Sequence, residues 1–230
     1  VSTQQVVKML NLGDVFPNFD AETTIGKTNF HEWLGDGWAI LFSHPADYTP
    51  VCTTELARVV KLSPEFQKRG VKMIALSCDH VDSHNGWAKD VLKFSGDPSG
   101  TLPYPIIADT DRSLAVKLGM VDPDEKDAAG MPLTCRAVFI IGPGKKLKLS
   151  LLYPATTGRN FDEILRVVDS LQLTATYKVA TPVDWKSGQK CMVVPSVSKE
   201  DAAKLFPKGV ETVAVPSGKS YLRFTPDPNY

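Results

Sequence analysis

Short apolar runs alternate with stretches of helical periodicity through most of the chain. Three mostly apolar runs predict buried strands, at 38–43, 71–77 and 104–108. Apolar positions at helical spacing predict helices after these strands, at 53–68, 82–94 and 112–118. Pro64 lies inside the first of these helices, where it should start a new turn or kink the segment.

Two further apolar runs, 136–141 and 147–152, flank the turn Gly142-Pro-Gly-Lys, and this pattern predicts a β-hairpin. Asn160 then begins a helix as its N-cap, with the matching Glu163 three residues later. Strands interleaved with helices and closed by a hairpin and a helix predict a layered α/β sheet.

The composition of the chain changes near Tyr177. The stretch that follows, 178–230, contains six of the 17 prolines, a short strand candidate at 191–194 and a short helix at 199–205. We therefore expect two domains, residues 1–176 and a small α+β domain of residues 177–230.

The overall composition is that of an ordinary globular protein, with 43% hydrophobic and 23% charged residues in 230. Lys plus Arg and Asp plus Glu are both 26, so the formal net charge is zero and no global field recruits nucleic acid or an anionic membrane. No apolar run reaches the roughly 18 residues of a transmembrane helix. The first ten residues are too polar for a signal-peptide core, and whether a presequence was removed stays open.

The chain has four cysteines, Cys52, Cys78, Cys135 and Cys191, and no C-x-x-C pair. A secreted disulfide scaffold would be shorter and denser in cysteine. The spacing therefore favours free thiols in a reducing compartment, and we expect a cytoplasmic protein.

Cys52 stands at the boundary between a predicted strand and a predicted helix, in the stretch HPADYTPVCTTE of residues 44–55. A structural cysteine usually packs on an apolar face as an inert small hydrophobe, whereas this one is surrounded by Pro, Thr and Glu. The thiolate is the nucleophilic form of cysteine, and a helix N-terminus or a nearby guanidinium favours it. The position therefore makes Cys52 a candidate nucleophile.

The spacing Pro45-x-x-x-Thr49-x-x-Cys52 matches the active-site signature of the peroxiredoxins. The stretch Pro154-Ala-Thr-Thr-Gly-Arg159 resembles a later helix entry of the same family, and residues 178–226 resemble the C-terminal domain of its one-Cys class, the peroxiredoxin 6 type. The resemblance covers essentially the whole chain. It implies a thioredoxin-like fold with a C-terminal domain that helps form a homodimer, and a peroxidase that reduces hydrogen peroxide and organic hydroperoxides.

The resemblance also assigns roles to individual residues. Cys52 would be the peroxidatic nucleophile, which the reaction converts to a sulfenic acid. Arg136 would supply the cation that favours its thiolate, Thr49 would hydrogen-bond the peroxide, and Pro45 would shield the thiolate from water. No bound cofactor is implied.

Two further positions match residues near the peroxidatic cysteine of the family, namely His44 and Arg159. His44 is as readily explained as a packing residue, and Arg159 as a surface ion-pair partner. Separately, Cys78, His80 and His84 have metal-like spacing, but a strand end followed by a polar helix start explains them without a fourth ligand, so we expect no metal site.

The thiol that reduces the sulfenic acid is not identified by the sequence. No Val-Cys-Pro triplet of the two-cysteine classes occurs. Because side chains alternate across a strand, Cys135 should face away from Cys52 if Arg136 faces toward it, and we expect Cys135 to be buried. Cys78 ends a buried strand and Cys191 lies in the second domain. The family precedent is an external thiol, glutathione, delivered in some members with a glutathione transferase.

The one-Cys class is also credited with a phospholipase A2 activity that uses a serine hydrolase triad. Here the matching positions are Gly37 in place of the serine and Gly144 in place of the aspartate, so that only His31 remains. We expect no such activity from these positions, and the alternative left open is a nucleophile from an unrelated nearby serine such as Ser43. An alternative to a peroxidase is a redox sensor that signals through Cys52 mixed disulfides.

Overall fold

The computed structural model describes residues 10–98 and 100–230. The chain divides into two compact units, with the boundary between Phe161 and Asp162. The boundary expected from composition lies later, at residues 176 and 177, because the intervening helix belongs with the second unit. Residues 1–9, for which the sequence predicts no signal peptide, lie outside the described part.

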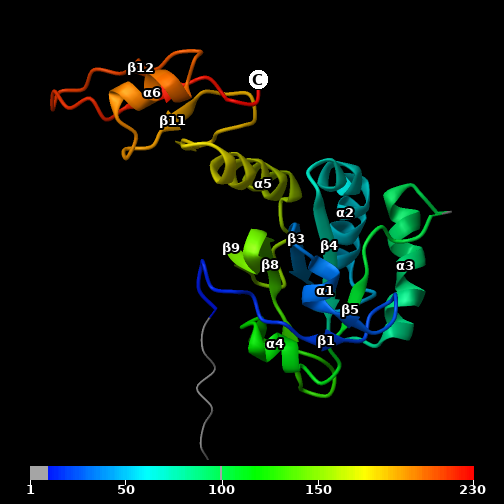
Figure 1. Cartoon of the computed structure of the whole chain (residues 1–230). Coiled ribbons are helices and arrows are strands. Elements are labelled where there is room, and N and C mark those ends of the chain that lie inside the picture. Colours follow the sequence, from blue (N-terminus) through cyan, green and yellow to red (C-terminus); the bar gives the residue numbers. More distant parts are fainter. Residues whose placement is uncertain (1–9, 99) are drawn as a thin grey trace, which may run out of the picture. The chain divides into compact units, whose positions relative to one another are not determined.

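The first unit is built on a five-stranded mixed sheet with the order β5-β4-β3-β8-β9 (Figure 1). Its strands are β3 (Trp38–Ser43), β4 (Val71–Ser77), β5 (Ile106–Ala108), β8 (Arg136–Gly142) and β9 (Lys146–Tyr153). The first three are parallel, and β8 is antiparallel to both of its neighbours. This is the thioredoxin-like sheet that was expected, and the predicted hairpin is confirmed as β8 and β9.

Both faces of this sheet are covered, which explains why its inner strands are continuous apolar runs rather than alternating ones. Two long helices, α2 (Pro50–Lys68) and α3 (Val81–Ser95), pack against each other and against β4 and β5. The opposite face carries a core cluster that includes Phe16, α1 (Phe30–Leu34) and α4 (Ser113–Lys117).

Helix α2 departs from its prediction at two proline positions. It begins at Pro50, three residues before the predicted start, because proline is well suited to the first helical position. Pro64 does not interrupt it, although an internal proline costs roughly 3 kcal/mol or more. Leu62 and Phe66 on either side are buried, so tertiary packing holds the helix together across that position.

Several short elements were not predicted. Besides α1, the missed elements of the first unit are β1 (Asp20–Ala21), β2 (Thr28–Asn29), β6 (Val121–Lys126) and β7 (Pro132–Thr134). The β6–β7 pair is an irregular hairpin, and Arg112 holds it from outside by donating to the carbonyl of Pro132 at 2.8 Å and to Asp127 at 2.8 Å. Its polar sequence carries no strand periodicity.

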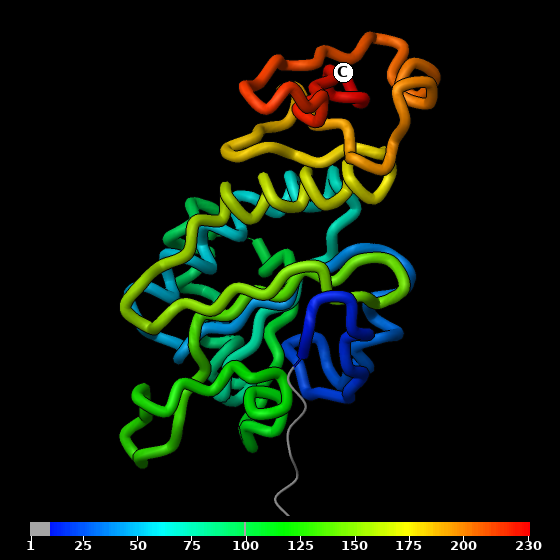
Figure 2. The backbone as a smooth tube through the Cα atoms, turned by 90° about the vertical axis from the view of Figure 1, so that its left-hand side faces the viewer, coloured from blue at the N-terminus to red at the C-terminus, as the bar shows by residue number. Residues whose placement is uncertain are grey.

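The second unit contains most of α5 (Phe161–Thr176), a four-stranded antiparallel sheet and α6 (Lys199–Leu205). Its backbone runs from yellow to red in Figure 2. The sheet has the order β10 (Val179–Ala180), β11 (Cys191–Val193), β13 (Arg223–Thr225) and β12 (Glu211–Thr212). Trp185, Cys191 and Phe206 lie in its own buried cluster. The predicted strand at 191 and helix at 199 are confirmed. Across the part of the chain that is described, no helix has both the length and the apolar character needed to cross a bilayer.

Candidate active site

Cys52 lies in the first turn of α2, immediately beyond the end of β3 and its connecting loop, and its exposed fraction is 0%. Thr49 is the N-cap, with extended backbone, and Pro50 follows it. The hydroxyl of Thr49 donates to the carbonyl of Ala46 at 2.9 Å and makes no capping bond to the helix. The positive end of the α2 dipole therefore faces Cys52 without a side-chain cap.

Arg136, the first residue of β8, contacts the thiol as expected. Its Nη1 donates to Sγ of Cys52 at 3.3 Å and to Oε2 of Glu55 at 2.8 Å, while Nε and Nη2 donate to the carbonyl of Ala155 at 2.9 and 2.6 Å. The guanidinium is 3% exposed. A permanent cation is thus fixed within hydrogen-bonding distance of the sulfur.

Glu55 is a central residue of the site that was not singled out from the sequence. It lies one helical turn after Cys52, is only 4% exposed, and accepts hydrogen bonds from both Arg136 and Arg159. Burial alone would raise its pKa, but the hydrogen bonds and charge of Arg159, with the charge of Arg136, outweigh burial and lower the pKa below its ordinary value. Glu55 is therefore an ionised buried carboxylate shared by two arginines.

Arg159 is buried, so it is not a surface ion-pair partner. Its Nε and Nη2 donate to the two oxygens of Glu55 at 2.9 and 2.7 Å, and its Nη1 donates to the carbonyl of Ala137 at 2.5 Å. The rings of Phe42 and Phe161 lie 5.9 and 5.3 Å from its guanidinium carbon. Arg159 therefore holds Glu55 in place and packs against the rings of Phe42 and Phe161.

His44 and Pro45 form the start of the loop that leads to Cys52, and both are buried. The backbone of His44 is held on both sides, since its N–H donates to Leu76 and its carbonyl accepts from the hydroxyl of Thr134. Its Nε2 lies 2.8 Å from Oδ1 of Asp47.

The set of metal-like residues weighed from the sequence does not come together. Among the described residues, the group with compatible ligand atoms is instead His44, Asp47 and His84. His80 is exposed and Cys78 is half-buried. Of the three residues weighed from the sequence, only His84 belongs to this group.

The other three cysteines lie in surroundings of a different kind. All four cysteines are free, and burial raises the pKa of Cys78, Cys135 and Cys191 to about 11 each. Cys135 belongs to the core cluster on the sheet face that also holds Ala137, opposite to Arg136, as the alternation of side chains predicted. These thiols stay protonated at neutral pH and are weak nucleophiles.

The positions of the hydrolase triad lie in one region but lack its chemistry. His31 in α1 pairs through Nε2 with the carbonyl of Phe16 at 2.7 Å, and the N–H of Phe16 donates to Lys145 at 2.8 Å, next to Gly144. Gly37 is exposed and follows α1. Neither glycine offers a hydroxyl or a carboxylate.

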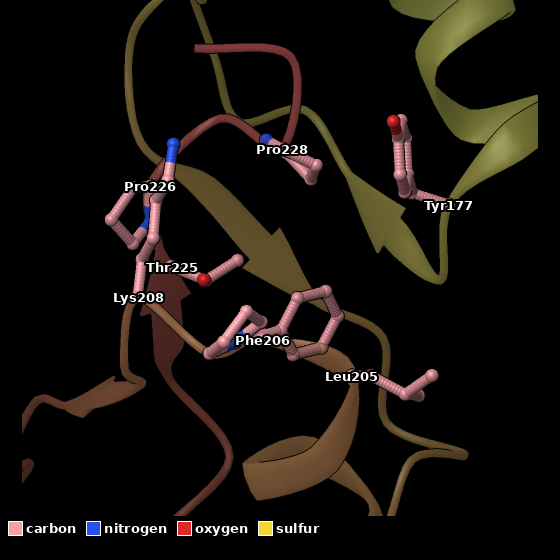
Figure 3. A pocket seen from close by; sticks show the side chains of 8 residues that line it. Tyr177, Leu205, Phe206, Lys208, Thr225, Pro226 and Pro228 are labelled. Atoms are coloured by element: carbon pink, nitrogen blue, oxygen red, sulfur yellow. The ribbon is translucent and has the colours of Figure 1, made fainter.

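A concave surface in the second unit is lined mainly by apolar side chains (Figure 3). Its lining residues are Tyr177, Leu205, Phe206, Pro207, Lys208, Thr225, Pro226 and Pro228. Cys191 of the same unit is fully buried and is not among them. This pocket therefore gives no access to that thiol.

Comparison with known proteins finds similarity over nearly the whole chain. The model of the AhpC/TSA family matches residues 12–150, and the model of the C-terminal domain of 1-Cys peroxiredoxin matches residues 170–209. Peroxiredoxin-6 from Gallus gallus is 69% identical over 95% of this chain and 98% of its own length, and Peroxiredoxin-6 from Homo sapiens is 64% identical over the same shares.

Solved structures give the same result for the fold. A cysteine-to-serine mutant of the Peroxiredoxin 6 of Arenicola marina superposes with a TM-score of 0.93 at 67% identity, covering 96% of this chain and 100% of that one. A yeast mitochondrial 1-Cys peroxiredoxin, solved to explain thiol resolution via the glutathione/thioredoxin systems, has a TM-score of 0.83 at 43% identity and covers 95% and 100% of the two chains.

Proposed function

This chain belongs to the one-Cys peroxiredoxins of the peroxiredoxin 6 type, which are thiol-dependent peroxidases, and we propose that Cys52 carries its peroxidase reaction. The observation that supports this most directly is the contact of 3.3 Å from Arg136 Nη1 to Cys52 Sγ at an uncapped helix N-terminus. The substrates are hydrogen peroxide and organic hydroperoxides.

In the first step the Cys52 thiolate attacks one oxygen of the peroxide. An S–O bond forms, the O–O bond breaks, and the leaving oxygen departs with the bonding pair and takes a proton to become water or an alcohol. Sulfur is oxidised to the sulfenic acid and the peroxide is reduced. No bound cofactor is needed.

The residues around Cys52 support the charge that moves in this step. Negative charge passes from sulfur to the leaving oxygen, and preorganised donors in a dry site stabilise such charge best. Arg136 and the first-turn amides of α2 supply the donors, and Thr49 orients the peroxide. Glu55 and Arg159 hold Arg136 in place, and Pro45 limits the entry of water.

Glutathione or another external thiol reduces the sulfenic acid. The first thiol attacks the sulfur of the sulfenic acid, water leaves, and a mixed disulfide forms on Cys52. A second thiol then attacks the mixed disulfide, which frees the Cys52 thiol and joins the two external thiols in a disulfide. The weak nucleophilicity of Cys78, Cys135 and Cys191, whose thiols have a pKa of about 11, argues against an internal resolving residue. The solved yeast relative, described with the glutathione/thioredoxin systems, supports the same route.

Intact-mass analysis after one equivalent of peroxide tests this function, with and without glutathione. The expected product is one added oxygen on Cys52, converted by glutathione to a mixed disulfide and then to the free thiol. Each cysteine is replaced singly by serine, and peroxide consumption is followed with excess small thiol. Retained turnover in Cys52→Ser, or lost turnover in Cys191→Ser, would contradict the assignment.

The proposal includes the absence of phospholipase A2 activity at the family's triad positions. Gly37 and Gly144 supply neither nucleophile nor orienting acid, and His31 is engaged with the carbonyl of Phe16. Release of the sn-2 fatty acid from phosphatidylcholine liposomes should stay at the no-enzyme level at acidic and neutral pH. Release that disappears in His31→Ala would overturn this part.

The enzyme acts as a cytoplasmic homodimer assembled with the help of the C-terminal domain. Glutathione is its co-substrate, a glutathione transferase is a protein partner, and it has no nucleic-acid partner. The competing function is redox sensing through mixed disulfides of Cys52. Steady-state rate separates the two, because a sensor turns over slowly with excess glutathione and keeps stable adducts with protein partners.

A further inference from the structure

A second cluster of titratable side chains lies behind the loop that leads to Cys52. Asp47 accepts from three donors: His44 Nε2 at 2.8 Å on one oxygen, and His84 Nδ1 at 2.7 Å and the Ser83 hydroxyl at 2.8 Å on the other. The side chains of His44 and His84 are 0% exposed and that of Asp47 is 1% exposed. The cluster joins the loop to α3 in a dry environment.

The hydrogen bonds of His84 define its protonation. One ring nitrogen faces the carboxylate of Asp47, and the other, Nε2, lies 3.2 Å from the carbonyl of Ile107. Both partners only accept hydrogen bonds, so both bonds form together only when both ring nitrogens carry protons. His84 thus joins Asp47 to the carbonyl of Ile107 through a single buried ring.

The opposite arrangement holds for His44. Its Nε2 faces Asp47 and therefore carries the proton, while burial lowers its pKa and keeps the ring neutral. Among the described residues, Nδ1 of His44 is the buried side-chain nitrogen or oxygen atom that lacks a hydrogen-bond partner. A neutral ring with Nε2–H leaves a bare lone pair at Nδ1, which can only accept.

This cluster is connected to the turn that carries Cys52. The ring of His44 packs on Trp87 with centroids 5.0 Å apart, Trp87 Nε1 donates to the hydroxyl of Thr53 at 3.1 Å, and that hydroxyl donates to the carbonyl of Thr49 at 2.8 Å. The ring of His44 is thus linked to the first turn of α2 through Trp87 and Thr53.

We propose that Asp47 and His84 are positioning residues of the peroxidase reaction, which fix His44 as the Nε2–H tautomer and so keep its Nδ1 as a free buried acceptor beside the peroxidatic loop. An unsatisfied buried acceptor is costly, so its retention points to an O–H donor that arrives during turnover. The reaction supplies two such donors, the hydroperoxide and the sulfenic acid. This inference rests on the proposed role of Cys52.

A metal ion is a weaker explanation of the same cluster. A metal bound by these atoms would have to displace the proton on each nitrogen that now faces Asp47. The existing hydrogen bonds already satisfy both carboxylate oxygens.

The test reads the histidine rings directly by nitrogen NMR of the whole chain. In the wild type, His44 should show the Nε2–H tautomer. In Asp47→Asn the amide can donate to His44 Nε2, which should move the proton of His44 to Nδ1, and kcat/KM for hydrogen peroxide should fall at least about tenfold. His84→Gln keeps an amide donor for Asp47, so its kcat/KM should fall less than that of Asp47→Asn.

Asp79→Asn is the matched control, because Asp79 accepts from the backbone N–H of Asp47 and touches neither imidazole in the described structure. It should leave the tautomer of His44 unchanged. An Nδ1–H tautomer in the wild type, or an unchanged tautomer and rate in a folded Asp47→Asn protein, would overturn the proposal. So would stoichiometric zinc binding that His84→Gln abolishes.

The Cys52→Ser variant tests the tautomer of His44 separately from the proposed role of Cys52. Cys52→Ser should abolish peroxide reduction yet keep the Nε2–H tautomer of His44. If Cys52→Ser stays active, the proposed function fails while the tautomer assignment stands.

Discussion

Glu55 accepts a hydrogen bond from Arg136 at 2.8 Å, so the cation that contacts Cys52 is itself held by a buried carboxylate one helical turn further along the same helix. Arg136 thus bridges the Cys52 thiol and the Glu55 carboxylate by donating to both. Its members come from α2 and from β8, which neighbours β3 in the sheet.

Glu55→Gln should destabilise the protein strongly, because it leaves two buried arginines without a counter-charge. Breaking a buried ion pair costs about 3–5 kcal/mol in the free energy of unfolding. Urea unfolding measures the loss. Glu65→Gln is the control: Glu65 pairs with Lys68 and Arg69 on the exposed side of α2, and solvent-exposed pairs contribute little to stability. Equal losses in the two variants would contradict the central role of Glu55.

Arg136→Ala should lower kcat/KM for hydrogen peroxide by about 10²–10³-fold, the usual cost of removing one transition-state donor. Arg136→Lys should recover only part of the loss, because an ammonium keeps the charge but cannot reach Cys52, Glu55 and Ala155 in one plane. Stopped-flow oxidation of Cys52 measures both, and iodoacetamide alkylation should slow in parallel. A full-rate Arg136→Ala protein would remove Arg136 from the mechanism.

Stability should fall as the pH drops below about 6.5, the ordinary pKa of histidine. His44 has a lowered pKa when folded, so the unfolded chain binds a proton there that the folded chain does not, and stability is lost as pH falls. The titratable groups whose charges influence His44 are Asp47, which is hydrogen-bonded to it, and, without such a bond, His84 and Asp79. Below about pH 4, Asp47 and Glu55, whose folded pKa values are also lowered, add a second loss. Denaturant titrations from pH 7 to 3 measure the curve; a flat profile above pH 5 would contradict it.

Gly86→Ala should displace Tyr48, because a β-carbon at Gly86 would lie 2.4 Å from the Tyr48 hydroxyl oxygen and 3.7 Å from the adjacent ring carbon. Tyr48 precedes Thr49 and has a φ of 54°, so its movement should disturb the loop before Cys52 and slow peroxide reduction. Tyr48→Phe removes the clashing oxygen.

The double variant should therefore recover the wild-type rate and gain about 0.5–1 kcal/mol in stability from alanine over glycine within α3. Gly37→Ala serves as a control, since the nearest atom to its added carbon is 3.9 Å away. No rescue in the double variant would show that Tyr48 and Gly86 are not coupled.

The sheet could be predicted because its inner strands are mostly apolar runs, and β3 and β4 have the predicted bounds. The contact of Cys52 with Arg136 could be predicted only through the family signature, since the two residues are far apart in sequence. The polar β6 strand could not be predicted, because it is held by Arg112 and not by its own apolar periodicity.

Glu55 was missed for a physical reason. A glutamate near the start of a helix is ordinarily solvated, and nothing local distinguishes one that two distant arginines will bury. The available signal was its spacing of one helical turn from Cys52, which places both on one face of α2. Asp47 was missed in the same way, because a loop aspartate shows no sign of the two histidines that surround it.

The hydroxyl of Thr49 bonds backward to Ala46, although threonine is well suited to close a helix by accepting a forward bond. A forward bond would stabilise α2 by about 1 kcal/mol, but it would also occupy amide donors at the end that faces the sulfur. The first turn of α2 is thus less stable than it would be with a side-chain cap, and its amide donors stay available near the sulfur. Selection for thermal stability alone should favour side chains that cap the N-terminus of α2. Variants obtained in that way should have a higher melting temperature and a lower peroxidase activity.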